Sequence, residues 1–244
     1  MYCIETKNLT KKYKNLIAVN NLNLKIKKNE LFSLLGTNGA GKTTTLKMLS
    51  TLTPETSGEI LINNLNLSQS KDKIKNIINI SPQDTAIAKN LTVKENLYFF
   101  AGVYEIKNKE NKIDELIEIF KLESVLNQKT KTLSGGWQRK LSIALSLIND
   151  PEILFLDEPT LGLDVIARKE LWKIIESLKN RTTIILTTHY MEEAEKLSDR
   201  VGIMSKGKLI LTDIPKEIIK KSGCTNFEDA FVKIVTGGEL QWEP

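Results

Sequence analysis

One eight-residue segment constrains the fold of this chain more than any other feature of its sequence. It reads Gly36-Thr37-Asn38-Gly39-Ala40-Gly41-Lys42-Thr43 and fits the pattern GxxxxGK[ST] at every fixed position. A short apolar run precedes it (residues 31–35), and a stretch of helix formers follows (residues 41–52). Glycines in such a loop let backbone N–H groups converge on phosphate oxygens, and the next helix points its positive end at the same anion. The segment therefore predicts a phosphate-binding P-loop; the alternative is a flexible glycine turn before a helix.

Two acidic residues follow a second apolar run and complete the expected phosphate site. Residues 153–156 predict a buried strand, which delivers Asp157 at its carboxyl end, where ligands bind in open α/β sheets. We expect Lys42 to reach the β- and γ-phosphates, and Thr43 and Asp157 to hold Mg²⁺. Glu158 can orient or deprotonate the attacking water. A strand that ends in two acids is commonplace alone, and the P-loop upstream is what favours the functional interpretation.

The order of predicted elements indicates an α/β fold with an all-helical middle. Strands dominate the first third, with a hairpin expected over residues 59–67 and one strand over residues 22–26. Residues 92–95 form a capping box, and further helices are expected over residues 109–120 and after Ser134. The last third alternates strands and helices, which is typical of a mostly parallel sheet covered by helices.

Composition narrows the class of protein. The chain has 244 residues, with 35 Lys+Arg against 30 Asp+Glu, and this net charge of +5 alone favours only a solvated lysine-rich surface. No apolar run approaches the ~18 residues of a membrane span. The N-terminus lacks the apolar stretch of a signal peptide, so we expect a cytoplasmic protein whose membrane role requires a partner. Cys3 and Cys224 lie in no metal-binding spacing and are expected to be free thiols.

A further motif carries a family resemblance. Leu133-Ser134-Gly135-Gly136, followed by a basic amphipathic helix, resembles the signature motif of the ATP-binding cassette (ABC) ATPases. The resemblance covers nearly the whole chain, and its motifs fall in the family's order. It implies a single domain over residues 1–244: a P-loop NTPase core with an N-terminal antiparallel β-subdomain (about 1–85 and 151–215), an inserted α-helical subdomain (about 86–150) and a C-terminal tail (about 216–244).

The resemblance also implies the site. Residues 161–164 match the loop at the seam of a head-to-tail dimer, homomeric or heteromeric, that sandwiches two ATP molecules. The residues implied to bind ATP are Tyr13 for adenine, Gly36, Thr37, Asn38, Gly39, Ala40, Gly41, Lys42, Thr43 and Thr44, and Ser134, Gly135 and Gly136 across the seam. The residues implied to bind Mg²⁺ are Thr43, Gln83 and Asp157, and those implied in hydrolysis are Glu158, His189 and Gln83.

Several of these residues have plainer interpretations. His189 is the only histidine and could be a surface or capping residue, Tyr13 could be surface filler, and Gln83 could be a polar loop residue. Trp137 departs from the glutamine usual after the signature motif, so its role is open. Residues 111–114 spell the NKxD pattern of GTPases, but they sit in a polar helical stretch, and we interpret them as a solvated helix start.

The resemblance implies the ATP-hydrolysing subunit of a transporter whose permease is a separate chain, at the inner face of the cell membrane. Residues 188–194 and 227–231 resemble the branch that serves drug and lipid exporters, and the cargo would be selected by the permease. One alternative is a soluble ABC ATPase that acts on nucleic acid or ribosomes. Gln83 and Ser134 are only 51 positions apart without sustained heptads, so no nucleic acid partner is expected. The other alternative, a P-loop kinase or GTPase, leaves residues 133–136 and His189 without a role.

Overall fold

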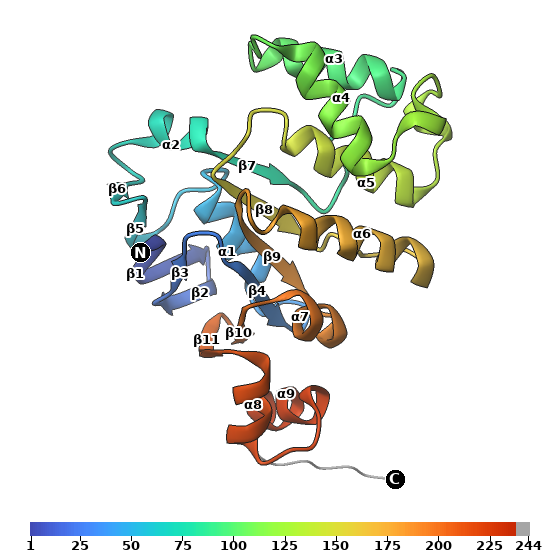
Figure 1. Ribbon diagram of the computed structural model, residues 1–244. Helices are drawn as coiled ribbons and strands as arrows, with labels where there is room; N and C mark the ends of the chain where they lie inside the picture. Colours follow the sequence, from blue (N-terminus) through green and yellow to red (C-terminus); the bar gives the residue numbers. More distant parts are fainter. Residues whose placement is uncertain (238–244) are drawn as a thin grey trace.

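Two β-sheets form the centre of the molecule in the computed structural model, which describes residues 1–237 (Figure 1). The first sheet is antiparallel and has the order β2-β1-β5-β6, with β3 paired to β1. Its strands are β1 (Tyr2–Tyr13), β2 (Leu16–Leu22), β3 (Lys25–Lys27), β5 (Ser57–Ile62) and β6 (Leu65–Asn66). The expected hairpin over residues 59–67 is confirmed by the β5–β6 pair.

The second sheet has the order β11-β10-β4-β9-β8-β7 and is parallel except for β11. Its strands are β4 (Leu31–Gly36), β7 (Ile78–Ser81), β8 (Ile153–Asp157), β9 (Thr183–Thr188), β10 (Arg200–Ser205) and β11 (Lys208–Asp213). The prediction of a mostly parallel sheet is therefore confirmed. Every residue of β4, β8 and β9 is buried, which explains why these strands read as continuous apolar runs.

Each central strand contributes side chains to two separate cores. Leu154 and Leu156 of β8 face the core made with the helices between residues 93 and 178, whereas Ile153 and Phe155 face the core shared with the helix after the P-loop and with the antiparallel sheet. This alternation follows the two-residue period of a strand. The helices around the sheets are α1 (Lys42–Leu49), α2 (Lys71–Ile77), α6 (Val165–Leu178) and α7 (Met191–Leu197).

A separate group of helices lies at one end of the parallel sheet, beyond β7 and β8 (Figure 1). It contains α3 (Val93–Val103), α4 (Lys109–Phe120), α5 (Gly135–Ser146) and the 3₁₀ turns Glu123–Val125 and Thr130–Thr132. The capping box is present: Glu95 N donates to Thr92 Oγ1 at 3.1 Å, and Thr92 N donates to Glu95 Oε2 at 2.7 Å. The NKxD residues lie at the start of α4, which confirms their interpretation as a helix start.

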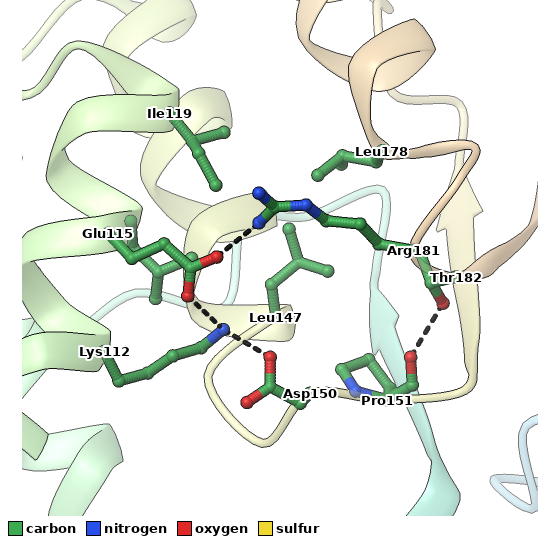
Figure 2. Close-up of a pocket in the computed structure, with 10 residues that line it drawn as sticks. Lys112, Glu115, Ile119, Leu147, Asp150, Pro151, Leu178, Arg181 and Thr182 are labelled. Atoms are coloured by element: carbon green, nitrogen blue, oxygen red, sulfur yellow. Dashed lines mark hydrogen bonds and ion pairs between the residues drawn. The ribbon is translucent and has the colours of Figure 1, made fainter. Parts of the chain in front are cut away.

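A charged cluster connects these helices to the core (Figure 2). Lys112 Nζ on α4 donates to Glu115 Oε2 at 3.0 Å and also pairs with Asp150. Glu115 in turn pairs with Arg181, which follows α6. The four residues, which we call the clasp, border a cavity of about 60 Å³ that Leu116 and Leu147 help to line. The clasp thus adds ion pairs to the apolar contact between α4 and the segments that precede β8 and β9.

Two features differ from the sequence-based expectations. The single strand expected over residues 22–26 is divided, because Thr6 Oγ1 donates to Leu22 O and accepts from Leu24 N, each at 2.9 Å, and so replaces the ladder there. The segment treated as a tail contains two helices, α8 (Pro215–Ser222) and α9 (Phe227–Thr236). They bury Phe227, Ala230 and Phe231 against β4 and β10. Residues 238–244 of that segment lie outside the described residues.

Within residues 1–237, no helix combines the length and the apolar character needed to cross a membrane.

Candidate functional site

The P-loop connects β4 to α1 and curves around the start of the helix. Gly41 has φ of +102°, and a Cβ added there would lie 2.5 Å from Ala18 O, so only glycine fits. The loop borders a cavity of about 650 Å³, which is large enough for a nucleotide. Its lining residues are Leu16, Ile17, Ala18, Asn38, Gly39, Ala40, Gly41, Lys42, Thr43, Thr44, Gln83, Glu158, Leu161, His189, Lys206 and Gly207.

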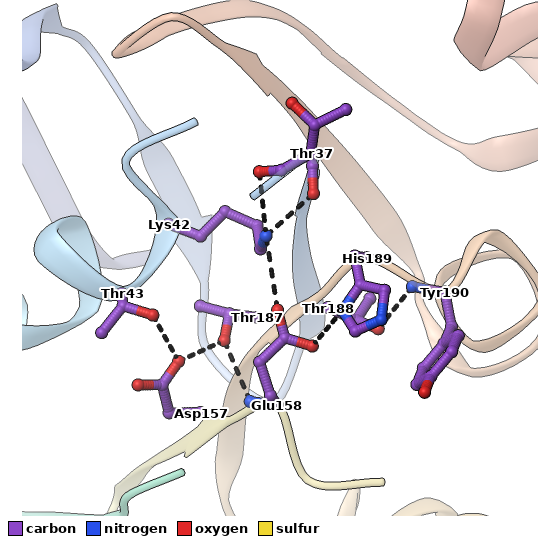
Figure 3. A network of polar contacts seen from close by, with 10 residues as sticks. Thr37, Lys42, Thr43, Asp157, Glu158, Thr187, Thr188, His189 and Tyr190 are labelled. Atoms are coloured by element: carbon purple, nitrogen blue, oxygen red, sulfur yellow. Dashed lines mark hydrogen bonds and ion pairs between the residues drawn. The ribbon is translucent and has the colours of Figure 1, made fainter. Parts of the chain in front are cut away.

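Lys42 lines this cavity and is held by a network of polar contacts (Figure 3). Its Nζ donates to Gly36 O at 2.8 Å and to Thr37 O at 3.3 Å, and lies 3.3 Å from Glu158 Oε1. The side chain is buried, so its charge acts at low dielectric, where it attracts an anion strongly. This geometry suits the phosphate-binding role expected of Lys42.

Asp157 is the last residue of β8, and its carboxylate accepts hydrogen bonds from two hydroxyl groups. Thr43 Oγ1 donates to Asp157 Oδ1 at 3.0 Å, and Thr187 Oγ1 donates to the same oxygen at 2.6 Å. The second contact follows from the register of the sheet, in which Asp157 lies opposite Thr187. A hydroxyl and a carboxylate thus face each other where the P-loop meets β8, and oxygen donors of this kind suit Mg²⁺.

Glu158 is buried and lies between Lys42 and His189 (Figure 3). Its Oε2 lies 2.8 Å from His189 Nδ1, and its backbone N–H is directed at Thr187 O and Thr187 Oγ1, each at 3.1 Å. Its φ is +49°, a left-handed conformation that costs free energy in a residue with a side chain. Strain of this kind gathers at functional sites, because the surrounding contacts must hold the residue in place.

The structure brings most of the expected site residues together, but not all of them. Gly36 and Thr37 line a neighbouring cavity that they share with Asn38 and His189. Tyr13 does not line the nucleotide cavity. Its exposed ring lies 5.0 Å from Lys11 Nζ instead, so adenine stacking stays a prediction. Leu16 and Ile17, which follow Tyr13 in the hairpin, line the cavity with apolar surface, and no sequence motif indicates this role.

The signature residues lie outside the lining of the nucleotide cavity. Ser134 occupies the N-cap position of α5, but its side chain makes no capping hydrogen bond. Ser134 and Gly135 are exposed, and Gly136 lies against Ala167 of α6, where an added Cβ would be 3.3 Å from Ala167 Cβ. Trp137 is half-buried against the core of the helical group, and its ring lies 4.6 Å from Lys140 Nζ. Trp137 thus packs within its own chain, and part of its side chain is left exposed.

Arg139 belongs to none of the sequence motifs, yet it contacts the loop of Gln83. Its buried guanidinium donates from Nη1 to Pro82 O at 2.7 Å and from Nη2 to Gln83 O. Burial lowers the pKa of Arg139, and the carboxylates of Asp157 and Asp84 oppose that shift. The contact joins α5, which begins at the signature residues, to the loop that presents Gln83. In the sequence, only the basic character of the helix after residue 136 hints at this contact of Arg139 with the loop of Gln83.

Glu193 is a second residue that the sequence did not single out. It is fully buried on α7, and its Oε1 accepts a hydrogen bond from Trp172 Nε1 at 2.9 Å. Burial raises the pKa of Glu193, and the hydroxyls of Thr188 and Thr160 oppose that rise. Among residues 1–237, neither Glu193 Oε2 nor Thr160 Oγ1 has a hydrogen-bond partner of good geometry. Thr160 lies two positions after Glu158, and Thr188 lies directly before His189. Glu193 is therefore close to the two segments that carry Glu158 and His189.

The described residues contain no cluster of three or more His, Cys, Asp or Glu that could hold a metal by itself. A metal at Thr43 and Asp157 would complete its coordination with water and phosphate oxygens, which is how Mg²⁺ is bound in phosphoryl-transfer sites. A parallel sheet, a P-loop before a helix and two acids at the end of a neighbouring strand together define a P-loop nucleoside triphosphatase.

Comparison with known proteins identifies the family. The family model described as "ABC transporter" matches residues 19–161. A model described as "AAA domain, putative AbiEii toxin, Type IV TA system" matches residues 130–193. The chain belongs to the ATP-binding subunits of the ABC transporter family.

Two curated relatives and a solved structure give the degree of similarity. The chain is 39% identical over 240 residues to the "Probable multidrug ABC transporter ATP-binding protein YbhF" of Escherichia coli, covering 95% of this chain but only 41% of that protein. It is 36% identical over 242 residues to the "Nod factor export ATP-binding protein I" of Cupriavidus metallidurans, covering 98% of this chain and 78% of that protein. A structure described as a dimeric post-hydrolysis state of the ATP-binding cassette MJ0796, bound to ADP and Pi, matches with a TM-score of 0.78 at 27% identity, covering 86% of this chain and 98% of that one.

Proposed function

We propose that this chain binds ATP with Mg²⁺ and hydrolyses it within a closed dimer, and that the cycle drives transport through a separate membrane permease. The observation that carries this proposal is the contact of one buried carboxylate, Glu158, with both Lys42 and His189 at the edge of the P-loop cavity. A phosphate-binding lysine, a candidate base and a histidine thus meet at one point. This arrangement suits attack of water on a phosphate.

The reaction would begin when the γ-phosphate of ATP accepts hydrogen bonds from Lys42 and from N–H groups of the P-loop. In the absence of ATP the Lys42 ammonium lies 3.3 Å from Glu158 Oε1. The bound phosphate would attract this ammonium away from Glu158, and Glu158 Oε1 would then be able to contact water. Glu158 accepts a proton from the water, whose oxygen bonds to the γ-phosphorus as the bond to the β-bridging oxygen breaks. ADP and phosphate are the products, and phosphate charge is stabilised by Lys42.

His189 would position Glu158 rather than act as the base. An Nδ1–H of His189 that donates to Glu158 Oε2, at 2.8 Å, would fix the direction of that carboxylate. Mg²⁺ would be held by Thr43 and Asp157, with Gln83 at the cavity wall, and would neutralise charge on the phosphate oxygens. The contact of Thr43 with Asp157 keeps these donors together.

A second copy, identical or homologous, would complete the site with Ser134, Gly135 and Gly136. Ser134 and Gly135 are exposed at the start of α5, where backbone N–H groups and the helix dipole attract an anion. They are outside the cavity of their own chain, so they are available to phosphate bound by another. A cassette described as dimeric and bound to ADP and Pi is similar to this chain, which supports a dimer here.

The helical group, residues 86–150, would carry the signal to the permease. Arg139 fixes the loop of Gln83 to α5, so a shift of the signature residues on dimer closure would move this loop. The permease would place this subunit at the inner face of the membrane. The relatives named for multidrug transport and Nod factor export favour export, although the E. coli relative extends well beyond the matched region.

Two measurements test this proposal. The purified chain should release phosphate from ATP in the presence of Mg²⁺, and the Lys42→Ala variant should not. In its own cells the tagged chain should copurify with a protein that has several membrane spans. A chain that hydrolyses no ATP with or without its membrane fraction, or that engages no membrane protein, would contradict the proposal.

A further inference from the structure

Glu193 is a buried carboxyl group that the proposed mechanism does not use. It lies on α7 with no exposed surface, and four groups act on its carboxyl: Thr188, Thr160, Trp172 on α6 and Glu158. A glutamate is almost never fully buried unless its polar atoms are paired. The contacts of this carboxyl therefore indicate what holds it there.

The hydrogen bonds around the carboxyl suit its neutral form. Its Oε1 accepts from Trp172 Nε1 at 2.9 Å. Thr188 Oγ1 accepts from Tyr190 N at 2.9 Å, so the hydroxyl proton of Thr188 is available to the carboxyl. Among residues 1–237, Glu193 Oε2 and Thr160 Oγ1 are both buried without a partner. A protonated carboxyl has one O–H to donate, and Thr160 Oγ1 is the acceptor that lacks a donor.

Burial favours the same protonation state. It raises the pKa of Glu193, and the carboxylate of Glu158 adds to that rise, whereas the hydrogen bonds from the polar neighbours oppose it. A neutral carboxyl also avoids a second negative charge beside Glu158, and it can offer the proton that Thr160 Oγ1 would accept.

Thr160 and Thr188 belong to the two segments that carry the reacting groups. Thr160 lies in the turn after β8, in which Leu161 N donates to Glu158 O at 3.1 Å, so a shift of Thr160 would move Glu158 with it. Thr188 directly precedes His189 (Figure 3). Because Glu158 Oε2 lies 2.8 Å from His189 Nδ1, a small displacement of either segment would break their contact.

We propose that Glu193 is a positioning residue for ATP hydrolysis, which acts as a neutral bridge between the segment of Glu158 and the segment of His189. Its O–H donates to Thr160 Oγ1, while Trp172 fixes its Oε1. The inference rests on the proposed function and adds to it a residue outside the lining of the nucleotide cavity. Misplacing a reacting group by about 1 Å can lower a rate by about 10²-fold, so the bridge affects turnover rather than ATP binding.

Steady-state ATPase kinetics test the bridge with one disruptive and one conservative variant. Glu193→Leu removes every hydrogen bond of the side chain, and should lower kcat at least about tenfold while KM for ATP changes less than about twofold. Glu193→Gln keeps one acceptor and a donor, and should retain at least about half of the parent's kcat. A Glu193→Gln variant as slow as Glu193→Leu overturns the inference, because a neutral donor would then not suffice.

Thr160→Val tests the other end of the bridge and changes the shape of its side chain little. It removes the acceptor, and should lower kcat about tenfold with KM nearly constant. The matched control is Thr212→Val on β11, which removes a second buried hydroxyl that has no partner among the described residues, and it should leave kcat unchanged. Urea unfolding verifies that each variant is folded. An unchanged rate in Thr160→Val, or equal losses in the two threonine variants, contradicts the bridge.

His189 supplies a spectroscopic measurement, because it is the only histidine in the chain. In untagged protein with ¹³C-labelled histidine, the imidazole signals in NMR spectra therefore need no assignment. Glu193→Leu and Thr160→Val should shift these signals in the absence of ATP, whereas Glu193→Gln and Thr212→Val should not. Signals that keep the parent's position in every variant overturn this inference alone. A parent that hydrolyses no ATP overturns the proposed function instead, and the NMR comparison still tests the bridge.

Discussion

Lys42 Nζ lies 3.3 Å from Glu158 Oε1, with both side chains buried. The ammonium that is expected to bind phosphate thus neutralises the carboxylate that is expected to receive a proton from water. An ion pair of this kind couples the two functions, because a phosphate that draws Lys42 towards itself leaves the carboxylate to its remaining partner, His189.

Lys42→Ala should lower the affinity for ATP by about 10- to 100-fold, because a charge-assisted hydrogen bond to phosphate contributes about 1.5–3 kcal/mol. Isothermal titration with ATP and Mg²⁺ measures the effect. The matched control is Lys206→Ala, since Lys206 lines the same cavity but is exposed and should matter much less. Equal losses in the two variants would contradict the special position of Lys42.

Arg139→Ala should lower kcat for ATP at least about tenfold while the dissociation constant for ATP stays nearly constant. The variant leaves Pro82 O and Gln83 O without their donor and so releases the loop that holds Gln83 in the cavity. Arg139→Lys keeps the charge but lacks the two-pronged donor, and should recover only part of the rate. Steady-state kinetics alongside ATP titration distinguishes this from general unfolding, which would lower both the rate and the affinity.

Glu193→Gln should make stability less dependent on pH. Burial raises the pKa of Glu193, so the folded state retains a proton that the unfolded state loses above the ordinary value of 4.5. The stability associated with the protonated carboxyl is complete below that value and declines as the pH rises towards the folded-state pKa. The amide of the variant cannot ionise, so the variant should gain stability relative to the parent as the pH rises above 4.5. Urea unfolding at several pH values measures this, and parallel curves would contradict the assignment.

Arg181→Gln should destabilise the protein by less than about 1 kcal/mol, because the clasp pairs are partly exposed to solvent. Burial would raise the pKa of Glu115, but Lys112 and Arg181 outweigh it and lower that pKa overall. The clasp therefore stabilises the fold above pH 4.5 and weakens as the acid titrates below it. The difference between variant and parent in urea midpoint should shrink in about 1 M salt. A difference that is unchanged by salt would argue for packing rather than charge.

The sequence predicts the parts of this molecule that depend on neighbours along the chain. The P-loop, the capping box at Thr92 and the acids after β8 all follow from local spacing, and the structure places the P-loop and these acids together at the carboxyl ends of parallel strands. Apolar runs identify β4 and β8 because both faces of these strands are buried.

The contacts that escaped prediction join residues far apart in the sequence. Arg139 reaches a loop 56 positions away, and Glu193 accepts from Trp172 across 21 positions, so no local pattern reveals either pair. The helices α8 and α9 were not predicted, because their apolar residues are buried only by contact with the distant strands β4 and β10. For Tyr13 the motif match predicts adenine stacking, and the exposed position of its ring beside Lys11 leaves that a prediction.

The most direct test of the central claim measures the Glu158→Gln variant in ATP and Mg²⁺. The account predicts that it binds ATP, hydrolyses it about 10²–10⁴-fold more slowly than the parent, and runs in light scattering at about twice the 27.6 kDa monomer mass. A variant that turns over at the parent's rate, or that stays monomeric at saturating ATP, would contradict the account.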